Sequence, residues 1–333
     1  MKRVFQFIFI GIIVSLALWV VKDIEFIEVY YIIKASNVYY FILAFFLYFL
    51  AFLLVNLRII ISQRGFANWK YGYNLLILFS GSFFNLITPG GGAGGEPVRA
   101  YFLTKRYKTK LTDTIGIIAG DKVFHHIAQI ILIAISVIAF ILLLPLSKIA
   151  TSLFIGLVFF TLIFASILLY LSFDKIKHNF KKLLKKFYFF KFIRNIYKSR
   201  EDYHLSLKKN LSKISIVFKK VIFDRKSMGI KLLLSFGYWI LVVLVSLFIF
   251  YSFGFKINFI FVLIVVFVGQ IISEISPIPG GVGVTESAMF LLYSALGVNT
   301  ELALLVALLE RIIYYFYALI IGGISIIYLK LTN

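Results

Sequence analysis

Two segments of the sequence combine a proline, several glycines and a glutamate. Residues 89–96 read Pro-Gly-Gly-Gly-Ala-Gly-Gly-Glu and residues 279–286 read Pro-Gly-Gly-Val-Gly-Val-Thr-Glu, with the same spacing from proline to glutamate. A helix does not continue through proline and closely spaced glycines. We therefore expect each segment to interrupt a helix and to hold a carboxylate, Glu96 or Glu286, beside freed backbone groups.

The freed backbone N–H groups of these glycines are candidate phosphate donors, because successive N–H groups form nests that bind anions. Arg99, three residues after Glu96, would add positive charge for a phosphate. The pattern differs from a nucleotide-binding phosphate loop, which ends in Gly-Lys-Ser or Gly-Lys-Thr. The candidate nest consists of Gly90, Gly91, Gly92, Gly94, Gly95, Gly280, Gly281 and Gly283.

A charged pair follows each segment at nearly equal distance. Asp121-Lys122 begins 25 residues after Glu96, and Glu310-Arg311 begins 24 residues after Glu286. Adjacent helical residues point about 100° apart, so one member can contact a facing element while the other faces a cavity. Ionisable residues inside a membrane are functional candidates. The candidate substrate-binding set is Glu96, Arg99, Asp121, Lys122, Glu286, Glu310 and Arg311; the alternative is that these charges only pair to hold the molecule together.

Other polar residues lie near these pairs. His125 follows Asp121 by one helical turn and precedes His126, an arrangement that suits a metal or a proton relay. Two ligands do not complete a metal site, so we favour histidines hydrogen-bonded inside the protein and expect no metal or other cofactor. Glu274 is a further candidate carboxylate, and Tyr314 and Tyr317 lie on the same helix face as Glu310.

The elements that position these residues are transmembrane helices. The 333 residues have a mean hydropathy of +0.99 and are 62% hydrophobic, well above a soluble domain. The chain is therefore expected to be an all-α polytopic membrane protein, forming one integral membrane domain over residues 1–333. Its lack of cysteine excludes disulfides, thiolate metal sites and a cysteine nucleophile. The predicted spans are Val4–Val21, Val38–Ile61, Thr114–Leu144, Ile149–Ser172, Lys231–Phe253 and Glu301–Leu329.

The cations set the predicted orientation, because cytoplasmic loops are enriched in Lys and Arg. We place both termini and the basic loop in the cytoplasm of a multi-pass cell-membrane protein, using Lys2, Arg3, Arg58, Arg64, Lys70, the cations of residues 99–110, and Lys330. Residues 71–104 then form a re-entrant hairpin from the cytoplasmic side, and residues 255–297 form one from the opposite side. Residues 38–144 and 231–328 are thus predicted to be inverted repeats.

Residues 173–230 form a basic segment with seventeen Lys/Arg and four Asp/Glu, a net charge of +13. Between membrane spans, such a segment is typical of the cytoplasmic membrane surface, and we expect contact with anionic lipid and none with nucleic acid. Its mixture of aromatic and basic residues favours interfacial helices, although a small helical domain is the alternative.

The two proline–glycine segments and Glu310-Arg311 resemble a flippase-like membrane family of the UPF0104 type, which includes the transmembrane region of lysylphosphatidylglycerol synthases. The shared marks are Thr88-Pro-Gly-Gly, residues 95–101 (Gly-Glu-Pro-Val-Arg-Ala-Tyr) and residues 276–286. The family tends to have Glu-Arg where this chain has Asp121-Lys122, so bidentate anion binding by that cation is not expected. Aminoacyl transfer is not implied, since the synthases add a large soluble catalytic domain.

The resemblance implies a transporter that moves a phospholipid or polyprenyl-linked headgroup between leaflets. Arg99, Lys122 and Arg311 would receive the phosphate, and the carboxylates would balance them or accept a cationic group or a coupling proton. We expect no enzyme activity. The alternatives are a membrane-embedded enzyme acting on a lipid phosphate through Asp121, His125 and Glu96, or a scaffold that binds anionic lipid through the basic segment.

Overall fold

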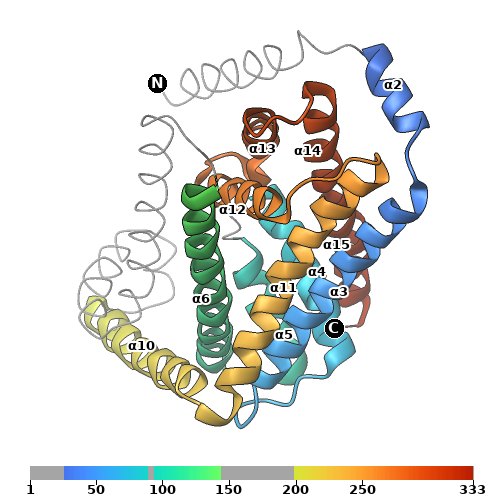
Figure 1. The fold of residues 1–333 in the computed structure, drawn as a ribbon. Coiled ribbons are helices and arrows are strands. Elements are labelled where there is room, and N and C mark those ends of the chain that lie inside the picture. Colours follow the sequence, from blue (N-terminus) through green and yellow to red (C-terminus); the bar gives the residue numbers. More distant parts are fainter. Residues whose placement is uncertain (1–25, 89–93, 144–198, 333) are drawn as a thin grey trace, which may run out of the picture.

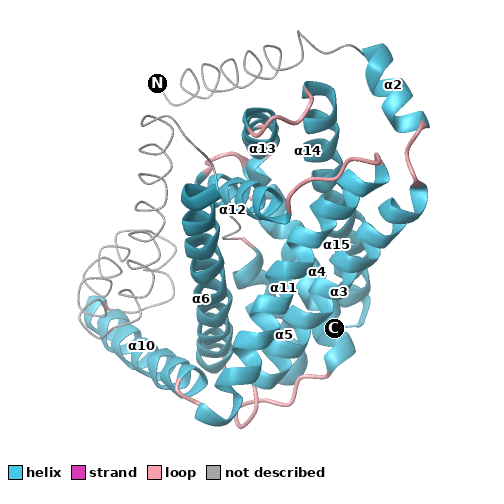
Figure 2. Ribbon diagram, viewed as in Figure 1, coloured by secondary structure: helices cyan, strands magenta, loops and turns pink. Residues whose placement is uncertain are grey.

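The computed structural model describes residues 26–88, 94–143 and 199–332, and within these ranges every regular element is a helix (Figures 1 and 2). The all-α prediction is confirmed. Four helical stretches are long and apolar enough to cross a membrane: Val38–Ser62, Leu111–Ser136, Arg225–Ser252 and Thr300–Thr332. They coincide with four of the predicted spans. The predicted spans Val4–Val21 and Ile149–Ser172 lie outside the described residues.

The long helices alternate with pairs of shorter ones. In chain order the described elements are α2 (Phe26–Lys34), α3 (Val38–Ser62), α4 (Tyr71–Ile87), α5 (Gly95–Tyr107), α6 (Leu111–Leu143), α10 (Arg200–Ile222), α11 (Arg225–Ser252), α12 (Phe259–Ile275), η2 (Pro279–Gly281), α13 (Val284–Ala295), α14 (Thr300–Tyr315), the π-helical η3 (Phe316–Ile321) and α15 (Gly322–Thr332). Figure 1 places α12 and α13 near one end of α6 and α10 near its other end.

Both proline–glycine segments interrupt helices, as predicted. The first lies between the end of α4 at Ile87 and the start of α5 at Gly95. In the second, Gly280, Gly281 and Gly283 have φ angles of 63°, 66° and 80°. Residues with a side chain rarely adopt such angles, so glycine is needed for the sharp turn between α12 and α13.

The centre of the fold is the antiparallel pair α3 and α11. The Tyr40 ring stacks on Phe248 with centroids 6.0 Å apart, while Arg58, further along α3, reaches Ser235 near the start of α11. The end of α3 therefore lies beside the beginning of α11. Apolar and aromatic side chains fill this contact and extend it to η3, where Tyr317 donates a hydrogen bond to the Phe45 carbonyl at 2.8 Å.

Helix α10 packs closely on α6 at two glycines one turn apart. A Cβ atom on Gly116 would lie 2.8 Å from the Val217 Cβ, and one on Gly120 would lie 2.9 Å from the Val221 Cβ. Small residues four positions apart allow helix backbones to approach in this way. The described part of the basic segment is thus a helix held against a membrane span; residues 173–198 lie outside the description.

A buried ion pair joins α3, α6 and α11. Arg58 donates from Nε and Nη2 to the two Asp121 carboxylate oxygens, at 3.0 Å each, and from Nη1 to the Ser235 hydroxyl at 2.8 Å. Ser62 donates a further hydrogen bond to Asp121 at 2.9 Å. Arg58 and Asp121 are each only 2% exposed. Arg58 is one of the cations predicted to be cytoplasmic, but its side chain is buried between helices.

We expect Gly116→Val to loosen α10, because the added side chain would overlap Val217 and the Ile214 carbonyl. Overpacking of this kind destabilises by about 1–3 kcal/mol. Hydrogen exchange over residues 200–222 should accelerate, while the thermal unfolding midpoint falls. Gly229→Ala is the matched control, since nothing lies within 4 Å of its new Cβ. Unchanged exchange in Gly116→Val would contradict the proposed close packing.

We expect Asp121→Asn to destabilise the protein strongly, because Arg58 would keep its charge without a counter-ion. Removing one partner of a buried ion pair costs about 3–5 kcal/mol. Thermal or denaturant unfolding of purified protein in detergent measures this loss. Lys122→Gln changes a neighbouring side chain that is 40% exposed, and should cost less than about 1 kcal/mol. Equal losses in the two variants would show that the Arg58–Asp121 pair has no special role in stability.

Candidate functional site

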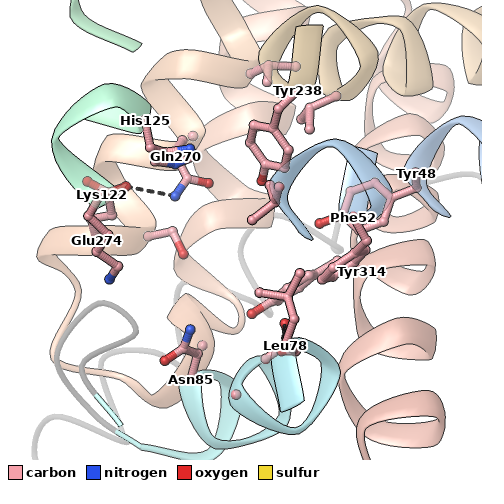
Figure 3. A pocket seen from close by; sticks show the side chains of 18 of the residues that line it. Tyr48, Phe52, Leu78, Asn85, Lys122, His125, Tyr238, Gln270, Glu274 and Tyr314 are labelled. Atoms are coloured by element: carbon pink, nitrogen blue, oxygen red, sulfur yellow. Dashed lines mark hydrogen bonds between the residues drawn. The ribbon is translucent and has the colours of Figure 1, made fainter. Parts of the chain in front are cut away.

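A polar cavity of about 420 Å³ lies among the helices, and its lining comes from α3, α4, α5, α6, α11, α12, η2, α13 and α14. Figure 3 shows Tyr48 and Tyr314 on one side and Lys122 and Glu274 on the other, with Asn85 at the turn-side end of α4. Among the predicted site residues, the cavity brings together Glu96, Arg99, Asp121, Lys122, Gly280, Glu310 and Arg311.

The first interruption contributes an ion-pair cluster to this cavity. Glu96 lies in the first turn of α5 and accepts from Lys122 Nζ at 2.9 Å and from Arg99 Nη1 at 3.0 Å. Two cations therefore share one carboxylate. The Glu96 side chain is 22% exposed, so the cluster faces the cavity and is not sealed in the protein core.

Arg99 has hydrogen-bonding capacity left over. The residue is 6% exposed, and its Nε and Nη2 atoms have no partner among the described residues. Gly81 on α4 makes room for it, because a Cβ atom there would lie 2.7 Å from the Arg99 Cδ. An unsatisfied buried donor is costly, so these atoms suit a ligand acceptor or water in the cavity.

The second interruption likewise has a glutamate bound by the basic member of the charged pair that follows it. Glu286 is in the first turn of α13 and accepts from the Gly283 N–H at 2.8 Å and from Arg311 Nε at 3.2 Å. The Tyr315 hydroxyl also donates to Glu286. Arg311 Nη2 donates to the Gly280 carbonyl, which ties the turn to α14. Glu286 and Arg311 are therefore largely satisfied by protein partners.

The acidic members of the charged pairs point to the central helices. Asp121 is bound by Arg58 on α3, while Glu310 accepts a hydrogen bond from Ser246 on α11. The basic members, Lys122 and Arg311, bind the glutamates of the interruptions. All four residues line the cavity, but the acidic and basic members of each pair bind different elements, which agrees with the 100° separation of neighbouring helical residues.

The glycine nest is only partly described, because Gly90, Gly91 and Gly92 lie outside the described residues. The Gly95 N–H donates to the Asn85 side chain at 2.6 Å, and the Gly281 N–H donates to the Ile278 carbonyl at 3.0 Å. With Gly283 bound to Glu286, these three donors are used within the protein. These three backbone groups are therefore not available to a ligand at the cavity.

The histidines pack inside the protein. The His125 ring lies 4.7 Å from the Trp239 ring, and His126 Nδ1 lies 3.1 Å from the Gln129 Oε1 atom. Asp121 is already occupied by Arg58 and Ser62. No group of three metal-ligating side chains occurs in the described part of the chain.

Sequence reasoning missed several cavity residues. Arg58 lies within the predicted apolar span Val38–Ile61. A charge inside a membrane span needs a partner, so this position was the available signal that Arg58 pairs with another side chain. Gln270 donates to Glu274 at 2.9 Å, and Tyr48 and Tyr238 line the aromatic wall; nothing in their sequence context distinguishes them from ordinary packing residues. Of the two tyrosines on the Glu310 face, Tyr314 lines the cavity and Tyr317 packs among the rings of α3.

Comparison with known proteins places these features in a family. Residues 6–322 match the model of the lysylphosphatidylglycerol synthase TM region. The UPF0104 membrane protein PH1989 of Pyrococcus horikoshii is 27% identical over 256 residues, 75% of each chain. A UPF0104 membrane protein of Methanothermobacter thermautotrophicus is 25% identical over 303 residues, and MJ1595 of Methanocaldococcus jannaschii is 26% identical over 306; each alignment covers 89% of this chain and 86% of the relative.

No solved structure matches the chain. The family match extends over both interruptions and both charged pairs. It includes three of the four described membrane-length helices in full and the fourth as far as residue 322. The chain is an integral membrane protein, and it belongs to the family of the lysylphosphatidylglycerol synthase transmembrane region.

Proposed function

We propose that the protein is a lipid transporter that moves a phosphate-bearing headgroup between the leaflets of the cell membrane, with the acyl chains remaining in lipid. The observation that carries this proposal is Arg99, a buried cation at the cavity with two nitrogen atoms that have no hydrogen-bond partner among the described residues. A phosphate oxygen would satisfy those donors by charge-assisted hydrogen bonds. Lys122, beside Arg99 on the shared carboxylate Glu96, supplies the second positive charge.

The proposal includes two re-entrant hairpins that enter from opposite sides. The first, α4–α5, follows the end of α3, and the second, α12–α13, follows the end of α11. Because α3 and α11 are antiparallel, these ends lie at opposite ends of the helix pair. Interrupted helices at membrane depth are tolerated where they line a polar cavity, and both interruptions do so.

Contacts between the halves support an inverted repeat. Helix α4 of the first half packs on α15 of the second, and α12 of the second packs on α6 of the first. Residues in equivalent positions are 188 to 190 apart in the sequence, and they make equivalent contacts. The matching pairs are Arg58 and Ser246, Gly81 and Gly269, Glu96 and Glu286, Arg99 and Met289, Asp121 and Glu310, and Lys122 and Arg311.

This correspondence separates structural charges from those available to a substrate. Glu286 and Arg311 bind each other and the turn, so we assign them to holding α13 against α14. Arg99 has no charged counterpart, since Met289 fills the same space beside Gly269. The substrate phosphate therefore binds at the first hairpin, and movement of one repeat against the other opens the cavity alternately to each leaflet.

We expect Arg99→Gln to reduce headgroup translocation at least about tenfold, because a hydrogen bond to a charged group is worth about 1.5–3 kcal/mol. The measurement is the rate at which a fluorescent phospholipid or polyprenyl phosphate crosses liposomes containing purified protein. Glu201→Gln, an exposed carboxylate on α10, is the control for a charge change outside the cavity. A native rate in folded Arg99→Gln protein would remove Arg99 from the substrate site.

We expect Glu96→Gln also to slow translocation while insertion and folding survive, since Lys122 and Arg99 would lose the carboxylate that orients them. Glu286→Gln should slow it as well, but with a larger fall in thermal stability, because Arg311 and Tyr315 would lose a buried partner. Lipids recovered from these assays should keep their mass. A new covalent product would favour a membrane-embedded enzyme and contradict the transport proposal.

A further inference from the structure

A second pocket, of about 590 Å³, lies where α10 meets α11 and the end of α3. Its lining includes four cations and one carboxylate. The cations are Arg64, Lys219, Lys220 and Lys231, and the carboxylate is Asp224. The pocket therefore has an excess positive charge of three, and it is separate in lining from the central cavity.

Three of these cations have no ion-pair partner among the described residues. Within the described ranges, Arg64, Lys220 and Lys231 form no ion pair with a carboxylate. Asp224 instead accepts a hydrogen bond from Ser227 in the first turn of α11. A concentration of unpaired cations around one hollow favours an anion as its occupant.

Lys231 gives the pocket a fixed charge at its base. The residue is 1% exposed, its Nζ donates to the Val221 carbonyl at 2.6 Å, and it lies 4.5 Å from the centre of the Phe124 ring. These contacts hold the ammonium group in place but supply no negative charge. Asp224 and Asp121 offset part of the Lys231 charge, but neither forms an ion pair with it in the described structure. An anion in the pocket would therefore stabilise this buried cation further.

The position of the pocket indicates which class of anion binds there. The membrane-length stretches Val38–Ser62 and Arg225–Ser252 end and begin there, so the pocket lies at the depth of lipid headgroups. Phe223, at the pocket, is 70% exposed, which offers an apolar contact beside the cations. Basic pockets between membrane helices bind lipid phosphates in this way.

We infer that this pocket binds the phosphate headgroup of an anionic membrane lipid, as a site distinct from the central cavity and independent of transport. Arg64 and Lys220 contact the phosphate, and Phe223 contacts an acyl chain. The buried Lys231 adds a further positive charge. Ser62 lines the pocket and also donates to Asp121, so the bound lipid lies directly beside the Arg58–Asp121 pair.

The test compares short-chain lipids added to the purified full chain in detergent. Dihexanoyl phosphatidylglycerol should raise the thermal unfolding midpoint and slow hydrogen exchange in residues 63–68 and 219–226, whereas dihexanoyl phosphatidylcholine should not. The double variant Arg64→Gln/Lys220→Gln should bind phosphatidylglycerol at least tenfold more weakly. Lys208→Gln/Lys209→Gln removes the same charge from exposed positions of α10 away from the pocket, and should bind as the native protein does.

Arg99→Gln separates this site from the central cavity. Protection of residues 63–68 by phosphatidylglycerol should persist in that variant, whether or not the protein transports lipid. Equal weakening in both double variants would attribute binding to diffuse charge and overturn the inference. Equal protection by inorganic phosphate at the same concentration would assign the pocket to a soluble anion and overturn the lipid assignment.

Discussion

The ion pair between Arg58 and Asp121 is the interaction on which the arrangement of the long helices depends. A charge inside a membrane protein must find a partner, and here both carboxylate oxygens and three guanidinium nitrogens are used within one cluster. The cluster joins three helices from distant parts of the chain. It fixes how far α3, α6 and α11 are displaced along one another, which apolar packing alone specifies weakly in lipid.

The two halves of the proposed repeat satisfy this requirement with different partners. Arg58 corresponds to Ser246, so Asp121 has a full counter-charge and Glu310 has only a hydroxyl partner. Arg99 corresponds to Met289, so the first hairpin has a cation where the second has an apolar side chain. Equivalent backbone positions thus hold different chemistry. The proposed transport of a single headgroup requires such a difference, because two identical halves would bind the headgroup equally.

Several features were predictable because their signals are local. Long apolar stretches predicted four spans, and proline with clustered glycines predicted both helix interruptions. Glu96 precedes Lys122 by 26 residues and Glu286 precedes Arg311 by 25, and this nearly equal spacing indicated a repeated arrangement of charges. The structure joins each of these two pairs. These inferences needed only the geometry of a helix and the free-energy cost of burying charged or hydrogen-bonding groups without partners.

Other features depend on contacts between distant residues and carry little local signal. The partner of Arg58 is 63 residues away, and the space for Arg99 is made by a glycine on another helix. The position of α10 on α6 similarly depends on Gly116 and Gly120, whose role is visible only when the facing helix is known.

The π-helical segment Phe316–Ile321 continues from α14 into α15 without leaving the helix. A π turn accommodates one residue more than a regular turn, and one residue corresponds to about 100° of rotation. The face defined by Glu310 and Tyr314 therefore does not continue as a straight stripe along α15. The last membrane-length helix therefore has two differently oriented faces. The face on α14 lines the central cavity, and the face on α15 packs on α4.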